Sequence, residues 1–546
     1  MHAEVGPITQ TPLTPLSFLK RSAHVYRDRL GVTEGSLSFT YGELGERSRS
    51  LAGALRDLGV EVGDRVAVLS PNSHVLLEAH FGVPGAGAVL VAVNNRLAPV
   101  EVRYILEHSQ AKVLVYDKDM AAVAQDAAQG SEGIKLLEAG EANSPFESLL
   151  SKATPYWAEP SDELTMLSIN YTSGTTGKPK GVIYQHRGAF LQALAMAFHT
   201  RLGPESCYLW TLPMFHTNGW CFPWAVTAAG ARHRCLRRID PTEIWRAIRE
   251  EGVTHLCAAP TVLLMVANHP AARDGAPRTI SVMTGGAPPT PTLLERLAEL
   301  RIEVIHLYGL TETYGPAAIC EWRPEWSELP LREQAQIKAR QGVGNIVSEG
   351  IRIVDDRGTD VPADATTLGE ITIRGNNVMA GYFRDPAATQ IAIRDGWFRT
   401  GDLAVMHPDG YVEIRDRRKD IIISGGENIS SVEVERALTT HPAVLEAAVV
   451  GRSDDVWGEV PIAVVELQSG QRFDPQELID HVKSQLAHFK APRAVYVMAL
   501  PRTSTGKVQK HVIRRSIANR EVATSQVVGG NNDERIREEG GSDDAR

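Results

Sequence analysis

The stretch Tyr171–Val182 most constrains what this chain can fold into. Its sequence is YTSGTTGKPKGV, and ten of its twelve residues are Thr, Ser, Gly, Lys or Pro, so it cannot form a buried helix or strand. An apolar run, Leu164–Ile169, precedes it and predicts a strand. Converging backbone N–H groups, hydroxyls and two lysines after a strand are typical of a loop that binds a di- or triphosphate. The alternative is a flexible polar loop at the surface.

The Walker A loop, Gly-x4-Gly-Lys-Ser/Thr, is the nearest well-known rival for this stretch. Here Thr172 stands five residues before Gly177, and Pro179 follows Lys178. Proline has neither a hydroxyl for magnesium nor an N–H for phosphate. The pattern therefore excludes the Walker reading.

Around this loop, short apolar strands alternate with helices. Arg65–Leu69, Ala88–Val93 and Lys112–Tyr116 predict strands. Thr40 and Glu43 form a capping-box pattern that predicts a helix to near Leu58. Such alternation indicates an α/β architecture with helices packed on sheets.

The texture changes twice further on. From Gly342, short segments such as Ile351–Val354, Glu370–Arg374 and Gly381–Phe383 predict a small β-rich subdomain. After the charged run Asp416–Asp420 a second, smaller α/β pattern begins. We therefore expect an α/β fold with a large N-terminal domain of two α/β layers plus a small β subdomain, and a small, mobile α+β C-terminal domain. The expected ranges are 1–418, 419–525 and a disordered tail, 526–546.

Composition limits the partners. The chain has 546 residues, of which 43% are hydrophobic and 23% charged, and its net charge of −9 comes without a dense basic patch. These values argue against a nucleic-acid partner. Five widely spaced cysteines without a CxxC predict buried thiols in a cytoplasmic protein, and Met1–Pro7 lacks the pattern of a signal peptide. No apolar stretch is long enough for a membrane span.

Polar residues follow several predicted strands, where open α/β sheets bind ligands. Gly286-Ala287-Pro288 follows one strand, and Tyr308-Gly309 leads into Thr311-Glu312. Glu312 is either a magnesium ligand or a solvated surface glutamate. His216 lies in the aromatic segment LPMFHTNGW, as a pocket residue or as a hydrogen-bonded core histidine. Asp402 is either a ribose ligand or a turn aspartate.

Five motifs together resemble the acyl-adenylate-forming (ANL) superfamily, over about residues 15–520. They are 171–182, Tyr308–Thr313, Thr400–Asp402, Asp416–Asn428 and Arg502–Lys507. The likeness is greatest to short- and medium-chain acyl-CoA ligases, including those similar to 3-methylmercaptopropionate–CoA ligase. The resemblance implies an AMP-forming acyl-CoA synthetase that uses ATP, Mg²⁺, coenzyme A and a small carboxylic acid, and a homodimer is compatible with it.

For the first half-reaction, in which the acid becomes an acyl-AMP, the resemblance implies a set of binding residues. Thr311 would contact phosphate, Glu312 would hold magnesium, and Lys507 would reach the substrate carboxylate and the α-phosphate. The nucleotide would be held at the phosphates by Thr172, Ser173, Gly174, Thr175, Thr176, Gly177, Lys178 and Lys180, at adenine by Gly286, Ala287, Pro288, Tyr308 and Gly309, and at ribose by Asp402 and Arg417.

For the second half-reaction, in which the CoA thiol displaces AMP, the resemblance implies a rotation of the small domain. Lys419 matches the hinge, and the loop of Gly425, Gly426 and Glu427 would approach the thiol. His216 would gate the passage between the ATP and CoA sides. Two alternatives inside the superfamily remain open, a ligase acting on preformed acyl-AMP and one that loads a carrier protein. A non-catalytic nucleotide-binding protein is a third.

Overall fold

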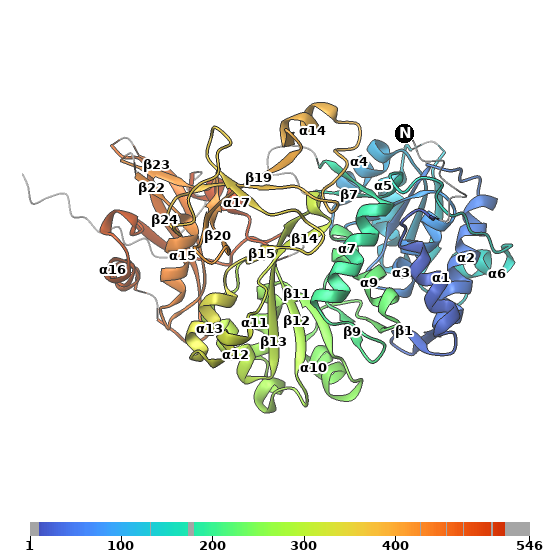
Figure 1. The fold of residues 1–546 in the computed structure, drawn as a ribbon, viewed down its shortest axis with the longest axis horizontal. Coiled ribbons are helices and arrows are strands. Elements are labelled where there is room, and N and C mark those ends of the chain that lie inside the picture. Colours follow the sequence, from blue (N-terminus) through green and yellow to red (C-terminus); the bar gives the residue numbers. More distant parts are fainter. Residues whose placement is uncertain are drawn as a thin grey trace, which may run out of the picture. The chain divides into compact units, whose positions relative to one another are not determined.

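The computed structural model describes residues 10–131, 133–172, 179–425, 427–454, 456–472, 474–503 and 506–518. Of the sequence predictions, Ser173, Gly174, Thr175, Thr176, Gly177, Lys178, Gly426 and the tail 526–546 lie outside these residues. The chain divides into two compact units (Figure 1). The first extends to Thr400 and includes Val405–Glu413, and the second comprises Gly401–Ala404 and the residues from Ile414 onward. The domain boundary at Lys419 stays a prediction.

A six-stranded sheet forms one layer of the first unit. Its strands are parallel except β8, which returns antiparallel to β7. Strands β3 and β4 are runs of Val, Ala and Leu that are buried almost throughout, as parallel strands covered on both faces require. The order is β6 (Lys135–Ala139), β5 (Ala111–Asp117), β3 (Arg65–Leu69), β4 (Val89–Val93), β7 (Met166–Tyr171) and β8 (Gly181–Gln185).

The helices of this layer begin at the residues that cap them. At α2, Glu43 N donates to Thr40 Oγ1 at 3.2 Å and Thr40 N donates to the Glu43 carboxylate at 2.7 Å, which confirms the predicted capping box. The helices that follow in sequence are α2 (Tyr41–Asp57), α3 (His74–Gly85), α4 (Pro99–Ser109), α5 (Ala121–Ala128) and α6 (Pro145–Lys152).

A nine-stranded sheet forms the second layer. Its central strands are parallel, and the pairs β13–β14, β14–β15 and β1–β2 are antiparallel. The order is β15 (Val343–Gly344), β14 (Gly315–Ile319), β13 (Ile302–Leu310), β12 (Ile280–Thr284), β11 (His255–Ala258), β9 (Cys207–Trp210), β10 (Arg232–Cys235), β1 (Leu30–Glu34) and β2 (Leu37–Thr40).

Helices α7 and α9 run beside each other within the first unit (Figure 1). Helix α7 confirms the helix that the sequence predicts over Arg187–Phe198. The helices associated with this layer are α1 (Leu16–Val25), α7 (His186–His199), α9 (Phe222–Ala229), α10 (Pro241–Glu250), α11 (Pro260–Asn268), α12 (Pro291–Glu299) and α13 (Leu331–Lys338).

The predicted β-rich subdomain is a five-stranded sheet of β16 (Arg352–Val354), β17 (Gly369–Ile373), β19 (Trp397–Met406), β18 (Ile393–Arg394) and β20 (Val412–Arg417). Gly381–Phe383, expected as a strand here, is not part of it. The segment instead makes an isolated bridge from Tyr382 to Val182 of β8. It cannot extend further because Asp385 already caps helix α14 (Pro386–Ala392).

The second unit has its own five-stranded sheet and its own hydrophobic core. Ser430 and Asp474 cap two of its helices with their side chains. The strands are β22 (Glu427–Ile429), β21 (Ile422–Ser424), β24 (Gly458–Leu467), β23 (Val444–Asp454) and β25 (Ala494–Val497), and the helices are α15 (Ser431–Thr439), α16 (Pro475–Gln485) and α17 (Lys510–Ala518).

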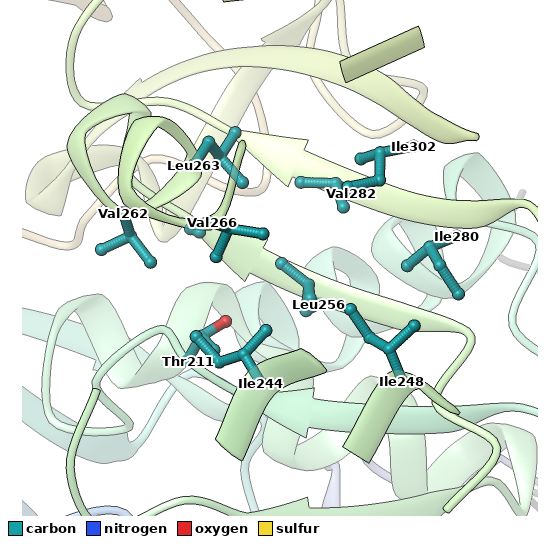
Figure 2. Close-up of a pocket in the computed structure, with 11 residues that line it drawn as sticks. Thr211, Ile244, Ile248, Leu256, Val262, Leu263, Val266, Ile280, Val282 and Ile302 are labelled. Carbon is teal, nitrogen blue, oxygen red and sulfur yellow. The ribbon is translucent and has the colours of Figure 1, made fainter. Parts of the chain in front are cut away.

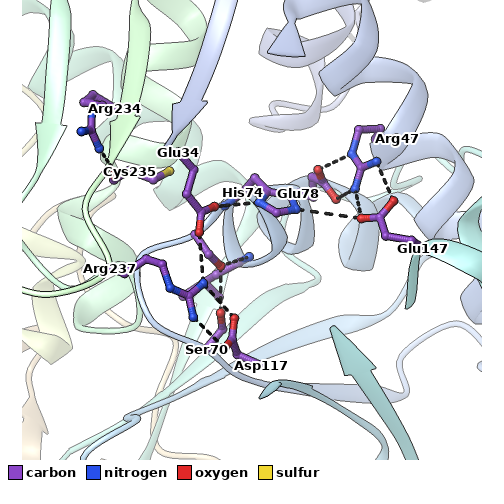
Figure 3. A network of polar contacts seen from close by, with 12 residues as sticks. Glu34, Arg47, Ser70, His74, Glu78, Asp117, Glu147, Arg234, Cys235 and Arg237 are labelled. Carbon is purple, nitrogen blue, oxygen red and sulfur yellow. Dashed lines mark hydrogen bonds and ion pairs between the residues drawn. The ribbon is translucent and has the colours of Figure 1, made fainter. Parts of the chain in front are cut away.

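A buried network of ion pairs connects the two large sheets of the first unit (Figure 3). Arg237 bridges Glu34 of β1 at 3.0 Å and Asp117 of β5 at 2.7 Å. His74 Nδ1 lies 2.7 Å from Glu34, and on the other side Arg47 pairs with Glu78 and Glu147 at 2.6 Å each. Burial alone would lower the pKa of His74, but the carboxylates of Glu147 at 3.9 Å and of Glu34 at 2.7 Å, and the charge of Glu78, raise it to about 10. The imidazole is therefore charged at neutral pH.

All five cysteines are buried and free of disulfides, as their spacing predicts. Within the described part of the chain, no helix has the length and apolar character needed to cross a membrane.

Candidate active site

The mouth of the predicted phosphate loop is closed by the β7–β8 hairpin. Strand β7 ends at Tyr171 and β8 begins at Gly181, with these two residues opposite each other in the ladder. One step further, Thr172 N donates to the Lys180 carbonyl at 2.9 Å. Thr172 and Lys180 therefore face each other where the loop begins and ends.

Lys180 and Glu312 both contact Tyr382. The Lys180 ammonium lies 4.7 Å from the centre of the Tyr382 ring, and the Tyr382 hydroxyl donates to Glu312 Oε1 at 2.8 Å. Burial, followed by the charge of Glu312, raises the pKa of Tyr382, so the phenol stays protonated and remains a donor. The structure thus places a cation from the loop and a carboxylate from a distant turn on one tyrosine.

The turn that carries Thr311 and Glu312 is held by its neighbours. Leu310 N donates to Thr313 Oγ1 at 2.9 Å, and Thr313 Oγ1 donates to the Gly315 carbonyl at 2.7 Å. The Tyr184 hydroxyl donates to the Thr311 carbonyl at 2.7 Å. A Cβ on Gly309 would stand 1.9 Å from the Gly315 oxygen, so only glycine allows β14 this close.

The expected adenine-binding residues lie at adjacent strand ends. Thr284 of β12 pairs with His306 of β13, so the loop after β12 and the end of β13 meet at one edge of the sheet. Gly286 and Ala287 in that loop are exposed, Pro288 is half-buried, and Tyr308 is buried. The arrangement provides an accessible strip of backbone beside an aromatic ring.

A left-handed helical turn follows His216. Its five residues have φ angles of 54° (Thr217), 40° (Asn218), 53° (Gly219), 54° (Trp220) and 65° (Cys221). L-residues cost roughly 1–2 kcal/mol each in this conformation, so the surroundings must hold the turn in place. Thr217 Oγ1 lies 3.5 Å from Thr311 Oγ1, and Trp220 packs where side chains on Gly285 or Gly315 would collide with it. The turn thus lies against both loops that the sequence singled out, and His216, half-buried, starts it.

In the second unit, Asp402, Arg417, Lys419 and Lys507 come together. Arg417 Nε lies 3.0 Å from Asp402 Oδ1, and Asp402 is only 3% exposed. The pKa of Lys507 is lowered to about 8 by the surrounding protein and then by the positive charges of Arg417 and Lys419. The residue as a whole is exposed, so water screens part of this effect. Burial also lowers the pKa of Lys419.

Gly425 and Glu427 also belong to the second unit. Gly425 has φ 60°, its N–H donates to the Trp457 carbonyl at 2.8 Å, and a Cβ there would meet the Trp457 ring at 2.8 Å. Glu427 is exposed at the start of β22. The glycine turn therefore lies beside an exposed tryptophan.

Two cavities in the first unit differ in character. Figure 2 shows a gap of about 10 Å³ among the apolar side chains of α10, α11 and the nine-stranded sheet. Dry and barely large enough for one water, it is a packing defect. A wider groove of about 590 Å³ lies beside Leu191 of α7 and is lined by residues 346–349 and 374–376.

Sequence reasoning missed two residues, Tyr382 and Asn218 of the left-handed turn. Tyr382 follows Gly381 in the segment VMAGYF, a Gly-aromatic pair that could have suggested a ligand-side loop. Asn218 is preceded by Thr217 and followed by Gly219, and Asn-Gly does favour left-handed backbone.

A magnesium ion fits the donor set that is present. The described residues include no cluster of three or more His, Cys, Asp or Glu side chains that could enclose a metal. Mg²⁺ in nucleotide sites is held by one or two carboxylates together with substrate phosphates. Glu312, oriented by Tyr382, supplies one carboxylate beside the loop expected to bind those phosphates.

Comparisons with known proteins agree with this arrangement. The family model "AMP-binding enzyme" matches residues 19–383, and "AMP-binding enzyme C-terminal domain" matches residues 433–507. The chain is similar to the acetate–CoA ligase CCL3 of Humulus lupulus, with 44% identity covering 92% of this chain and 94% of that protein. It is 43% identical to the peroxisomal acetate/butyrate–CoA ligase AAE7 of Arabidopsis thaliana, over 93% of this chain and 95% of that one.

One solved structure shows a similar protein with a reaction intermediate bound. The o-succinylbenzoate CoA synthetase (MenE) from Bacillus subtilis, in complex with the acyl-adenylate intermediate OSB-AMP, superposes with a TM-score of 0.81 and 27% identity. The match covers 95% of this chain and 99% of that one.

Proposed function

The chain belongs to the AMP-binding enzyme family, and on that premise we propose that it joins a short- or medium-chain carboxylic acid to coenzyme A. It is an ATP-dependent acyl-CoA ligase, an AMP-forming acid–thiol ligase. The acetate and butyrate named for its relatives support the proposed size of the acid. The observation that carries the assignment of the site is the contact of Lys180 and Glu312 with Tyr382.

In the first half-reaction the substrate carboxylate attacks the α-phosphorus of ATP and pyrophosphate leaves. Negative charge spreads over the phosphoryl oxygens, so positioning and fixed positive charge do most of the work. Lys180 and the loop that it closes bind the β- and γ-phosphates, and Thr311 contacts phosphate. A magnesium ion held by Glu312 would neutralise phosphate charge when bound. Gly286, Ala287, Pro288 and Tyr308 receive the adenine.

The second unit contributes the remaining groups. Lys507 brings its ammonium to the carboxylate and the α-phosphate, and Asp402 with Arg417 binds the ribose. Lys507 suits a transient charge because it is a single cation on a flexible stem. Its neighbours Arg417 and Lys419 make its protonated form less stable than that of a free lysine, and the approach of an anion reverses that.

In the second half-reaction the CoA thiolate attacks the acyl carbonyl and the electron pair leaves with AMP. Lys507 has no bond to stabilise in this step. The second unit therefore turns about Lys419 and presents the Gly425–Glu427 loop to the thiol, with His216 gating the passage between the ATP and CoA sides.

A cytoplasmic location and a homodimer complete the proposal. The peroxisomal relative shows that the same family also works in an organelle. Fractionation of cells that express the full chain, together with gel filtration of the pure protein, tests both points.

The function is tested with a panel of straight-chain acids from acetate to octanoate. Pyrophosphate release and acyl-CoA formation are measured separately on the same preparation. We expect both activities with acids of two to six carbons. Acyl-CoA made only from supplied acyl-AMP, without pyrophosphate release from any acid, would contradict the proposal and favour a ligase for preformed acyl-AMP.

A further inference from the structure

The left-handed turn Thr217–Cys221 is fixed by one side chain, Asn218. Asn218 is fully buried, and its oxygen accepts hydrogen bonds from Ser168 Oγ and, at 2.6 Å, from Asn170 Nδ2. Its backbone N–H donates to Asn170 Oδ1 at 3.0 Å. Ser168 and Asn170 are two residues apart on β7, so both point to the same face of the strand.

The fourth bond of Asn218 fixes its orientation. Its Nδ2 lies 3.1 Å from His80 Nε2, and His80 Nδ1 lies 2.7 Å from the Leu76 carbonyl of the same helix. Nδ1 therefore carries the proton and Nε2 accepts, which requires a neutral ring. Burial lowers the pKa of His80 to about 4, so the ring is neutral at physiological pH. The amide of Asn218 is satisfied on both sides, without an alternative arrangement.

Strand β7 and the Thr311 turn are both elements of the proposed phosphate site. Strand β7 leads directly into Thr172 and the loop, and Thr217, next to Asn218, lies 3.5 Å from Thr311 Oγ1. The strained turn therefore connects the two elements. Asn218 is hydrogen-bonded to β7 on one side, and Thr217 contacts the Thr311–Glu312 turn on the other. Residues in strained conformations persist where the surroundings over-determine them, typically at functional sites.

We propose that Asn218 is a positioning residue for adenylation, which sets the position of the end of β7, where Thr172 begins the phosphate loop, relative to the Thr311–Glu312 turn. The proposal rests on the proposed function, because it assumes that these two elements act on ATP. Asn218 itself does not touch substrate. It acts through Ser168 and Asn170 on one side and through Thr217 on the other.

The test uses Asn218→Gly in the full chain, because glycine adopts positive φ freely and so removes the side-chain bonds without adding backbone strain. Three quantities are measured: the Kd of MgATP by calorimetry, pyrophosphate release with butyrate, and CoA capture of supplied butyryl-AMP. We expect a MgATP Kd weakened about tenfold and pyrophosphate release slowed roughly ten- to a hundredfold. Capture of butyryl-AMP should stay within about twofold of wild type in protein that is still folded at the assay temperature, although its Tm is lower because buried partners of Asn218 lose their hydrogen bonds.

Thr227→Val is the matched control. Thr227 is buried in the same unit and bonds Pro223 O at 2.8 Å and His233 Nε2 at 3.0 Å, away from β7 and Thr311. It should change neither half-reaction. If Asn218→Gly fails to fold, Asn170→Ser decides, because it leaves the turn's own residues intact and should show the same selective loss.

Two results would overturn the proposal. One is wild-type adenylation in the folded Asn218→Gly or Asn170→Ser protein, which would leave Asn218 with only a local backbone role. The other is equal loss in both half-reactions, which would indicate general destabilisation. A different result would contradict the proposed function itself, namely wild-type protein that releases no pyrophosphate with any acid. In that case the Kd of MgATP for wild type and Asn218→Gly would still test the role of Asn218.

Discussion

The lowered pKa of Lys507 predicts an alkaline limit to adenylation. With a pKa of about 8, the charged fraction of Lys507 falls from about nine-tenths at pH 7 to about one-tenth at pH 9. An ordinary lysine with a pKa near 10.4 would stay more than about nine-tenths charged over the same range. Because the charged form is the one that acts, activity is present below pH 8 and lost above it.

The assay is pyrophosphate release against pH at low ATP, since kcat/KM reports the ionisation of the free enzyme. We expect kcat/KM for ATP to fall about tenfold between pH 7 and pH 9. The alkaline fall of kcat should occur at higher pH than that of kcat/KM, because bound ATP brings negative charge beside the Lys507 ammonium and raises its pKa. CoA capture of supplied acyl-AMP should not show this limb.

Two variants isolate the group responsible. Lys507→Arg stays charged throughout, so its profile should be flat from pH 7 to pH 9 even though the planar guanidinium lowers the overall rate. Arg417→Gln removes the largest positive neighbour and should move the wild-type limb to higher pH, whatever it does to the amplitude. Wild-type and Lys507→Arg profiles that run parallel over this range would refute the reasoning.

Three further perturbations test other parts of the site and fold. Glu312→Gln removes an anionic ligand but not its shape, so the magnesium concentration for half-maximal pyrophosphate release should rise at least about tenfold; an unchanged titration would make Glu312 a surface residue. Lys419→Pro fixes φ near −65° and should stop one half-reaction while leaving the other and the Tm nearly normal; parallel loss in a folded protein would contradict the hinge. His74→Gln removes a side chain that stabilises the fold in its protonated form. This stabilisation is complete below pH 6.5 and is lost as the pH rises to about 10, and it amounts to about 5 kcal/mol of unfolding free energy at most. The Tm gap between wild type and His74→Gln should therefore narrow from pH 7 to pH 10, and a constant gap would show that His74 is not charged.

Much of the fold follows from local signals in the sequence. The capping residues Thr40, Ser430 and Asp474 mark helix starts through bonds over only two or three residues, so the sequence alone specifies them. Buried parallel strands such as β3 and β4 announce themselves as short runs of Val, Ala and Leu. The Gly-rich stretch could be placed after a strand for the same reason.

Contacts between distant segments could not be predicted this way. Tyr382 and Glu312 are 70 residues apart, and their hydrogen bond accompanies long-range backbone bonds from Met379 N to the Glu312 carbonyl and from Phe383 N to the Gly181 carbonyl. Glu34 and Arg237, 203 residues apart, form an ion pair because β1 and β10 are neighbouring strands, with Glu34 opposite Cys235. No local pattern separates these side chains from ordinary surface charges, which is why Glu312 could be proposed from its motif but its tyrosine partner could not.

The turn after His216 shows why a site can violate local preference. From sequence, Asn218-Gly219 favours a two-residue reversal, whereas the structure continues left-handed through Trp220 and Cys221, which disfavour it. Isolated, such a segment would relax, so bonds from β7 and α3 must supply the difference, and these come from residues 48 and 138 positions away. Strand β7, which leads into the phosphate loop, keeps this turn in its strained conformation. A displacement of β7 would therefore also let the turn relax. The hydrogen bonds that stabilise the turn therefore also couple it to the strand that leads into the loop. A substitution at Asn170 should change the position of Thr311, although no hydrogen bond joins the two residues.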